Sequence, residues 1–199
     1  MLEIEVRAIV NNKMELIQIL KEKGFVNTKN VVQHDIMLDK PDASLFVSGK
    51  KIRIRIEDDK STLTYKGDIN VDQNISKRTE LNIQIKQSEV DQYITFLTEL
   101  GYPICFQIKK ERQVLEKDGI IVTFDEWPII GCMMEIEGPE EQIKHVAEEV
   151  APDVKFSNYR LKELFEYKMQ ETGKSLAELK DMYYREKQFD LGHIELIIR

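Results

Sequence analysis

The sequence predicts an α+β fold in which about eight strands fill most of the chain and helices form its C-terminal part. Three observations support this fold class. Of the 199 residues 42% are hydrophobic, enough for a real core. Several short segments alternate strictly between apolar and polar residues, and others repeat apolar residues at helical spacing. Because single Gly and Pro residues rather than a linker separate these segments, we expect one main domain at residues 1–165 and a helical extension at residues 166–199.

Alternation of apolar and polar residues marks the strands. Most of the segments alternate strictly, and only the one that begins at Val31 is less regular. The expected strands are Leu2–Val10, Val31–Leu38, Lys51–Glu57, Thr62–Lys66, Arg78–Ile85, Ile104–Leu115, Ile120–Phe124 and Met133–Glu137.

Apolar residues three and four positions apart mark the helices, two of which end at a glycine, Gly24 and Gly101. The expected helices are Lys13–Lys23, Ser88–Leu100, Glu140–Val150, Tyr159–Glu171 and Ser175–Glu186. The last two are expected to cover the main domain, or alternatively to form a lid over it or a dimer contact. Their inward side chains would be Leu161, Leu164, Phe165, Leu176 and Leu179. The final segment His193–Arg199 fits a strand or a frayed end.

Charge and composition exclude several classes of protein. The 29 Lys and Arg against 36 Asp and Glu give a net charge of −7, which disfavours a broad basic surface for nucleic acid or an anionic membrane. No apolar run approaches the roughly 20 residues of a membrane span. The acidic segment Met1–Glu5 stands where a signal peptide would be basic, so we expect a cytoplasmic protein. Cys105 and Cys132 are expected to be small buried residues of a reducing compartment.

Like charges recur two residues apart on the expected strands, so the members of each pair point to the same side of a sheet. The pairs are Glu3 and Glu5, Arg53 and Arg55, Lys110 and Arg112, and Glu135 and Glu137. Taken singly, each pair fits a solvated strand face. Four together favour one sheet that gathers carboxylates and cations on a concave face, because like charges this close repel unless an opposite charge or a ligand lies between them.

Such a face suits phosphate chemistry. Paired carboxylates favour Mg²⁺ or Mn²⁺, and Arg and Lys bind phosphate oxygens. If the sheet is closed with these residues inside, the interior has to be a wet, ligand-holding tunnel, because burying each ion in a dry core costs several kcal/mol. We therefore expect metal-dependent phosphoryl or nucleotidyl transfer.

Other sites find little support. The histidines His34, His145 and His193 share no metal-ligand spacing, so zinc is not expected. The chain has no P-loop or Rossmann glycine motif, so side chains would have to hold a triphosphate. Trp127 and Tyr65 could stack on a base, although packing in the core or at the rim is the more common role of a lone tryptophan.

Eight strings in order resemble the CYTH superfamily of triphosphate tunnel enzymes, which includes class IV adenylyl cyclases, thiamine triphosphatases and tripolyphosphatases. They cover roughly residues 1 to 165 and read EIEVR at Glu3–Arg7, IRIR at Ile52–Arg55, LTYKG at Leu63–Gly67, RTELN at Arg78–Asn82, KKER at Lys109–Arg112, VTFDEW at Val122–Trp127, MEIEG at Met134–Gly138 and SNYRLKEL at Ser157–Leu164. The resemblance implies a closed antiparallel tunnel of eight strands, with helices outside, that holds a triphosphate along its axis.

The resemblance also implies roles for individual residues. The metal, Mg²⁺ or Mn²⁺, would be bound by Glu3, Glu5, Asp125, Glu135 and Glu137. The triphosphate would be bound by Arg7, Arg53, Arg55, Lys66, Arg78, Lys110 and Arg112. Arg7, Lys66 and Glu80 are the candidate catalytic residues, and Glu80 would bind a second metal or orient a base. A plain cross-strand ion pair is the alternative for Arg78 and Glu80.

The chain departs from the family pattern at three positions. The N-terminal lysine of the family is Arg7 here, and since arginine does not readily lose a proton, phosphate binding suits it better than general-base catalysis. Asn82 replaces an acid that follows Glu80 by two positions. Met37 stands where many members have a tyrosine, so a mechanism that depends on a tyrosine hydroxyl is not available.

The leading expectation is a metal-dependent enzyme that hydrolyses inorganic tripolyphosphate or a nucleoside or thiamine triphosphate. A class IV adenylyl cyclase, which would convert ATP to cyclic AMP and pyrophosphate, is the alternative, and a polyphosphate or nucleotide sensor without activity is a second one. The expected partner is a small molecule that contains a triphosphate. Binding to nucleic acid or to a membrane is not expected, and the sequence is also compatible with a homodimer.

Overall fold

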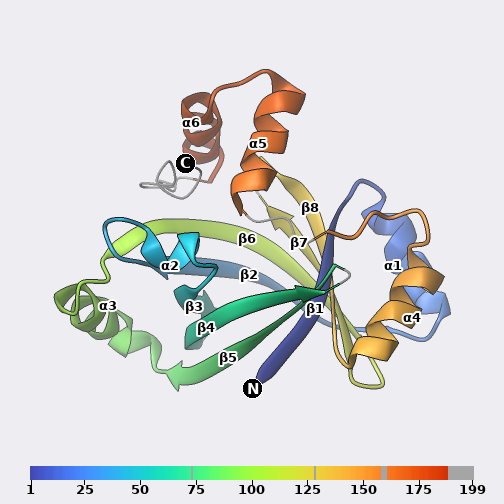
Figure 1. The fold of residues 1–199 in the computed structure, drawn as a ribbon. Coiled ribbons are helices and arrows are strands. Elements are labelled where there is room, and N and C mark those ends of the chain that lie inside the picture. Colours follow the sequence, from blue (N-terminus) through green and yellow to red (C-terminus); the bar gives the residue numbers. More distant parts are fainter. Residues whose placement is uncertain (73, 128, 158–160, 188–199) are drawn as a thin grey trace.

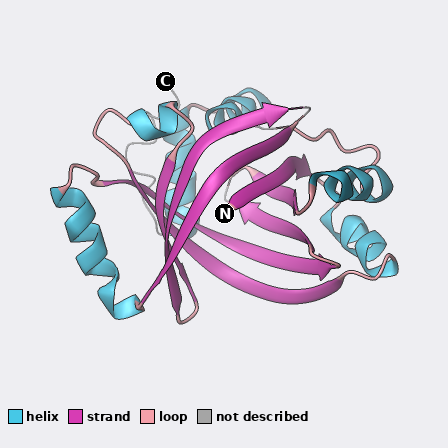
Figure 2. Ribbon diagram, turned by 60° about the horizontal axis from the view of Figure 1, so that its bottom comes forward, coloured by secondary structure: helices cyan, strands magenta, loops and turns pink. Residues whose placement is uncertain are grey.

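The structure, a computed structural model, describes residues 1–72, 74–127, 129–157 and 161–187. Eight strands, every pair of them antiparallel, close into a barrel in the order β1-β5-β4-β3-β2-β6-β7-β8 (Figures 1 and 2). The closed antiparallel barrel that the sequence and the family resemblance predict is therefore confirmed. The strands are β1 (Leu2–Val10), β2 (Val26–Leu38), β3 (Lys51–Glu57), β4 (Lys60–Asp72), β5 (Ile75–Ile85), β6 (Ile104–Lys117), β7 (Ile120–Trp127) and β8 (Gly131–Glu137).

Helices cover the outside of the barrel and one of its mouths (Figure 1). The expected helices are present in the described part of the chain, and Gly24 and Gly101 follow the first and third with a φ of +89° that suits glycine. A short helix at Ser44–Val47 has no counterpart in the prediction. The helices are α1 (Lys13–Glu22), α2 (Ser44–Val47), α3 (Val90–Glu99, after a 3₁₀ turn at Gln87–Glu89), α4 (Glu140–Val150), α5 (Leu161–Thr172) and α6 (Leu176–Lys187). The segment His193–Arg199 lies outside the described residues.

Three apolar clusters hold these helices to the barrel. Alternate residues of β1, β7 and β8 point outward and pack with Leu16, Leu20 and Ile143 of α1 and α4. On another side the outer face of β2 and β3 meets α3. The third cluster joins β2, β6 and β8 to Leu164 and Phe165 of α5 and to Leu179 of α6. The first two clusters lie on the outward faces of the strands. In the third, the inward residues Met37, Phe106, Ile108 and Met133 join α5 and α6, and the rest of the barrel interior is lined mainly by charged residues.

The helices α5 and α6 lie over one mouth of the barrel, on the same side as α2 (Figure 1). Three of the five side chains expected to face inward, those of Leu164, Phe165 and Leu179, are buried there. Leu176 packs against the same cluster, while the side chain of Leu161 lies outside the described part. These helices therefore pack on the barrel at one mouth, a position that suits either a cover or a lid, and their role stays a prediction.

The two cysteines are less buried than expected. Cys105 and Cys132 are free but only half-buried, because each sits near the end of its strand, whereas full burial was expected. Burial still raises the pKa of both thiols to about 12.

No helix in the described ranges is both long and apolar enough for a membrane span.

Candidate functional site

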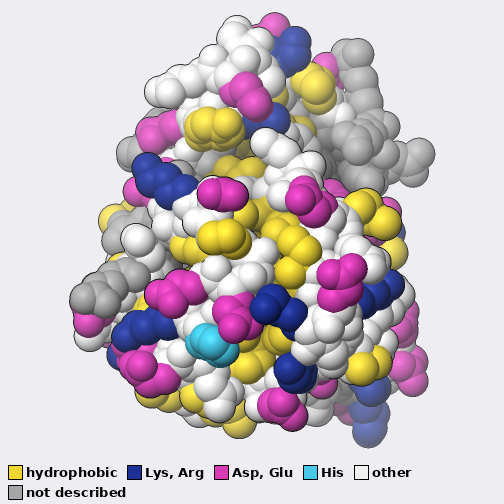
Figure 3. All heavy atoms as spheres, turned by 90° about the vertical axis from the view of Figure 1, so that its right-hand side faces the viewer, with side chains coloured by type: hydrophobic (Ala, Val, Ile, Leu, Met, Phe, Trp, Pro, Cys, Tyr) yellow, Lys and Arg dark blue, Asp and Glu magenta, His cyan; other side chains and the backbone are white. Residues whose placement is uncertain are grey.

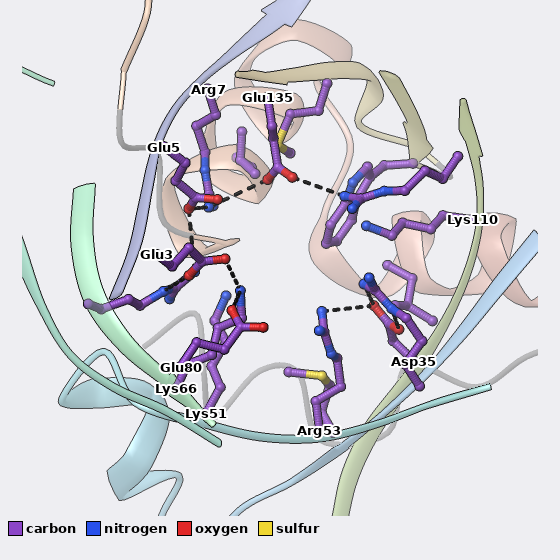
Figure 4. A pocket seen from close by; sticks show the side chains of 18 of the residues that line it. Glu3, Glu5, Arg7, Asp35, Lys51, Arg53, Lys66, Glu80, Lys110 and Glu135 are labelled. Carbon is purple, nitrogen blue, oxygen red and sulfur yellow. Dashed lines mark hydrogen bonds and ion pairs between the residues drawn. The ribbon is translucent and has the colours of Figure 1, made fainter. Parts of the chain in front are cut away.

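The inside of the barrel is a charged cavity (Figure 4). Its volume is about 170 Å³. Eight basic and six acidic side chains line it together with a set of apolar ones. The basic residues are Arg7, Lys51, Arg53, Arg55, Lys66, Arg78, Lys110 and Arg112. The acidic residues are Glu3, Glu5, Asp35, Glu80, Glu135 and Glu137.

On one side of the cavity, Glu3 of β1 lies between two cations. Its Oε2 accepts a hydrogen bond from Arg78 Nε of β5 at 2.6 Å, and its Oε1 pairs with the Lys66 ammonium of β4. Lys66 also pairs with Glu80 Oε2 at 2.7 Å. Burial alone would raise the pKa of Glu80, but Lys66 outweighs it and lowers that pKa to about 2. Glu80 is therefore ionised at neutral pH, where it accepts hydrogen bonds and cannot donate a proton.

On the facing side of the cavity, Asp35 of β2 holds the arginines of β3. Arg55 Nε and Nη2 donate to its two oxygens at 2.6 and 2.7 Å, a bidentate pair. Burial would raise the pKa of Asp35, but Arg55 and Arg53 hold it well below its usual range. Arg53 is less well paired, since its Nη1 stands 3.7 Å from Asp35 and its buried Nε has no hydrogen-bond partner among the described residues.

A third group links β6, β7 and β8. Arg112 Nε and Nη2 each lie 2.5 Å from an oxygen of Asp125, and Lys110 pairs with the same carboxylate. The Arg112 Nη2 also donates to Glu135 Oε2 at 2.9 Å. Asp125 is fully buried and does not line the cavity, so it holds Lys110 and Arg112 from behind.

Lys51 begins β3 and is the least compensated of the cations. Within the described ranges it makes no ion pair, and its partner across β3 and β4 is Lys66, another cation. Burial, with Arg78, Arg7 and Lys66 nearby, lowers the pKa of Lys51 well below its usual value. Lys51 and Arg53 are thus neighbouring cavity cations, of which Lys51 makes no ion pair in the described ranges and Arg53 makes a long one with Asp35.

The four glutamates expected to bind a metal come from neighbouring strands, and Glu5 pairs directly with Glu137 across β1 and β8. Arg7 pairs with Glu5 and lies 3.5 Å from Glu135. Burial together with Glu3 and Glu5 raises the pKa of Glu137 to about 7, as expected for a carboxylate in excess negative charge. In this conformation the described residues hold no group of three converging metal-ligating side chains. The donors suit a hard divalent cation, but Arg7 would have to release two of them.

This excess charge makes a prediction about the metal-free protein. A Glu137→Gln variant should gain stability over the wild type as the pH rises from about 4.5 to about 7. Over that range the folded wild type has to give up a proton that the unfolded chain has already lost. Because Glu137 is only partly buried, solvent screens the effect and we expect about 1 kcal/mol. Urea unfolding at pH 5 and pH 8 measures the difference, and an equal difference at both pH values would contradict it.

The site residues predicted from the sequence meet in the barrel cavity, with Asp125 as the one exception. Every predicted metal-binding, phosphate-binding and catalytic residue lines the cavity except Asp125, and their roles stay predictions. The prediction missed Asp35 and Lys51. Lys51 has the same strand parity as Arg53 and Arg55, which was a usable signal. Of the two candidate stacking residues, Trp127 lines the cavity, whereas Tyr65 does not and is 37% exposed.

On the face over α1 and α4, acidic and basic side chains are intermingled (Figure 3). One basic residue there, Lys23, pairs with Glu149 at 2.8 Å. Charges mixed in this way do not resemble the clustered basic stripe of a nucleic-acid-binding face.

Comparisons with known proteins agree with this geometry. A candidate adenylate cyclase of Methanocaldococcus jannaschii is 28% identical over 137 residues, which are 69% of this chain and 77% of that protein. The structure of the PH1819 protein from Pyrococcus horikoshii is 25% identical, has a TM-score of 0.65, and matches 83% of this chain and 99% of its own.

A third similar structure comes from a plant. A candidate adenylyl cyclase from Hippeastrum, described as having a dominant triphosphatase activity, has a TM-score of 0.63 over 87% of this chain and 97% of its own. At 18% identity it shows the shared fold alone. The model of the CYTH domain family matches residues 1–154, about three quarters of the chain. With its barrel and charged interior, the chain belongs to the CYTH domain family.

Proposed function

We propose that this protein is a metal-dependent enzyme that hydrolyses a triphosphate inside its barrel. The observation that carries the proposal is the cavity itself, where eight cations from five strands face six carboxylates. Stability of the fold does not explain this arrangement, because each ion buried in the interior costs several kcal/mol of folding free energy. A polyanion together with a cation would satisfy both sets of charges.

The cavity residues would bind the phosphates or position one another according to where they lie. Lys51 and Arg53, the least compensated cations, would bind phosphate oxygens with little loss of existing ion pairs. Arg55, Lys66, Arg78, Lys110 and Arg112 would add further contacts, and Arg7 would change partners from Glu5 to the substrate. Glu80 would position Lys66, since its low pKa makes it a poor base at neutral pH. Asp125 would keep Lys110 and Arg112 in place.

The carboxylates Glu3, Glu5, Glu135 and Glu137 would hold Mg²⁺ or Mn²⁺, which neutralises phosphate charge and polarises the phosphoryl group when bound. The raised pKa of Glu137 supports this assignment, because it marks negative charge that the chain's own cations leave unbalanced.

A product assay tests the proposal. Purified protein is incubated with Mg²⁺ or Mn²⁺ and, in parallel, with ATP, thiamine triphosphate and inorganic tripolyphosphate. We expect release of orthophosphate or pyrophosphate from at least one of them, and none when a chelator removes the metal. Binding of these compounds without any turnover under either metal would contradict hydrolysis and support a sensor.

The names of two relatives favour a second candidate, a class IV adenylyl cyclase. The same cavity would then hold ATP while the ribose 3′-oxygen attacks the α-phosphorus. Chromatography of the ATP reaction separates the two functions, because a cyclase yields cyclic AMP and pyrophosphate and a triphosphatase yields ADP or AMP.

A further inference from the structure

One end of the cavity is apolar. The inward residues of β2, β6 and β8 change from charged to apolar along the strands, from Asp35 to Met37, from Lys110 to Ile108 and Phe106, and from Glu135 to Met133. The register places Met37 opposite Phe106 and Asp35 opposite Ile108, so neighbouring strands change at the same end. The cavity therefore has an apolar part on the β2, β6 and β8 side of this end, whereas Arg53, the partner of Met37 across β2 and β3, belongs to the charged part.

The apolar part adjoins α2 and α5, because Phe46 of α2 and Leu164 of α5 line the cavity and belong to the same apolar cluster as Met37 and Phe106. Phe46 of α2 packs on Phe106 with ring centroids 5.4 Å apart, and Leu164 of α5 also lines the cavity. Asp39 fixes α2 in this position, since its carboxylate accepts hydrogen bonds from the backbone N–H groups of Leu45 at 3.0 Å and Phe46 at 2.9 Å. The hydrogen bonds of Asp39 and the ring contact of Phe46 therefore hold this apolar wall in position.

Trp127 stands where the two parts meet. The Lys110 ammonium lies 5.0 Å from the centroid of its ring, so the indole borders the predicted phosphate-binding cations. Its Nε1 is buried and has no hydrogen-bond partner within the described ranges. A buried donor without a partner carries a cost that an acceptor on a ligand would remove. The indole thus places its ring and one N–H next to the charged part.

We infer that the substrate is an organic triphosphate whose neutral, planar heterocycle binds against Trp127 and the apolar wall of Met37, Phe46, Phe106, Ile108, Met133 and Leu164. This inference rests on the proposed triphosphate chemistry and names its substrate class. Inorganic tripolyphosphate would leave the apolar wall without a partner. A permanently cationic ring is disfavoured because Lys110 lies over the same indole.

Fluorescence gives a direct test, because Trp127 is the single tryptophan of the chain. Wild-type protein is titrated without metal, so that no turnover occurs, with ATP, thiamine triphosphate or inorganic tripolyphosphate, and calorimetry on the same samples measures binding. We expect ATP to quench the emission far more than saturating tripolyphosphate does, and to bind more tightly than either other compound. Equal quenching and affinity for ATP and tripolyphosphate, or a preference for thiamine triphosphate, would overturn the inference.

A variant separates ring binding from phosphate binding. Trp127→Leu keeps an apolar side chain but removes the flat ring and the N–H, so it should weaken ATP binding about tenfold and leave tripolyphosphate binding unchanged. Trp127→Phe, which keeps a ring, should lose less. Phe96→Leu is the matched control, since Phe96 lies on α3 and is 60% exposed. Equal weakening for both compounds would refute the inference, whereas a wild type that binds no triphosphate even with Mg²⁺ or Mn²⁺ present would refute the proposed function itself.

Discussion

Replacing Glu135 by glutamine should lower metal-dependent turnover by about 100- to 1000-fold. Burial would raise the pKa of Glu135, but Arg7 and Arg112 hold it well below its usual range, so the group enters the reaction as a carboxylate. Glutamine has the same shape and an oxygen for the 2.9 Å contact with Arg112, but it lacks the charge that a divalent cation requires. Losing several kcal/mol of metal-assisted stabilisation corresponds to this range. Steady-state release of phosphate at saturating Mg²⁺ or Mn²⁺ measures it.

The same variant should behave differently when no metal is present. Glu135→Gln removes one negative charge from the cavity, so metal-free binding of tripolyphosphate should be as tight as in the wild type or tighter. Calorimetry in the presence of a chelator measures that affinity. Glu126→Gln on β7 is a matched control, because Glu126 pairs with Lys13 and does not line the cavity. If metal-free affinity fell as far as turnover, Glu135 would be a residue that positions Arg7 and Arg112 rather than a metal ligand.

The extent to which the sequence predicts the fold depends on how regular each strand is. The strands β1 and β3 alternate from end to end, and the predicted bounds Leu2–Val10 and Lys51–Glu57 match the structure. The strand β4 runs on to Asp72, six residues beyond the prediction, past Gly67 and a register shift between Lys66 and Ile69. The helix α2 has four residues, too few for an apolar period. Local pattern therefore suffices where pairing is regular and fails at bulges and single turns.

The candidate site could likewise be predicted only in part from the local pattern of the strands. Strand parity alone places Arg53 and Arg55 on one face, but it does not show which carboxylate they meet. Asp35 comes from the least regular strand segment, and its bidentate contact with Arg55 depends on the register of β2 against β3. The apolar end of the cavity also depends on tertiary structure, since α2 and α5 approach it from distant parts of the chain. Pairing between strands, which no single segment encodes, decides these contacts.

Asp125→Ala should destabilise the protein by about 3–5 kcal/mol, the usual cost of breaking a buried ion pair from one side. Its carboxylate is fully buried and binds both Lys110 and Arg112, so its loss leaves two cations without their main anion. Urea unfolding followed by circular dichroism measures the change. Asp68→Ala is the control, because the Asp68 side chain is 79% exposed and pairs with Lys50 at the surface, where we expect at most about 0.5 kcal/mol.

The pH dependence and a ligand separate this structural role from a loss of packing. Burial would raise the pKa of Asp125, but Lys110 and Arg112 lower it, so its stabilising effect is present above the unfolded pKa of about 3.9 and is lost as the pH falls further. The gap between wild type and Asp125→Asn should therefore be widest near pH 7 and narrow below about pH 4. Tripolyphosphate should restore part of the lost stability at pH 7, since it supplies anions to the same two cations. A destabilisation that neither low pH nor tripolyphosphate reduces would mean that Asp125 acts through packing and that Lys110 and Arg112 do not depend on its charge.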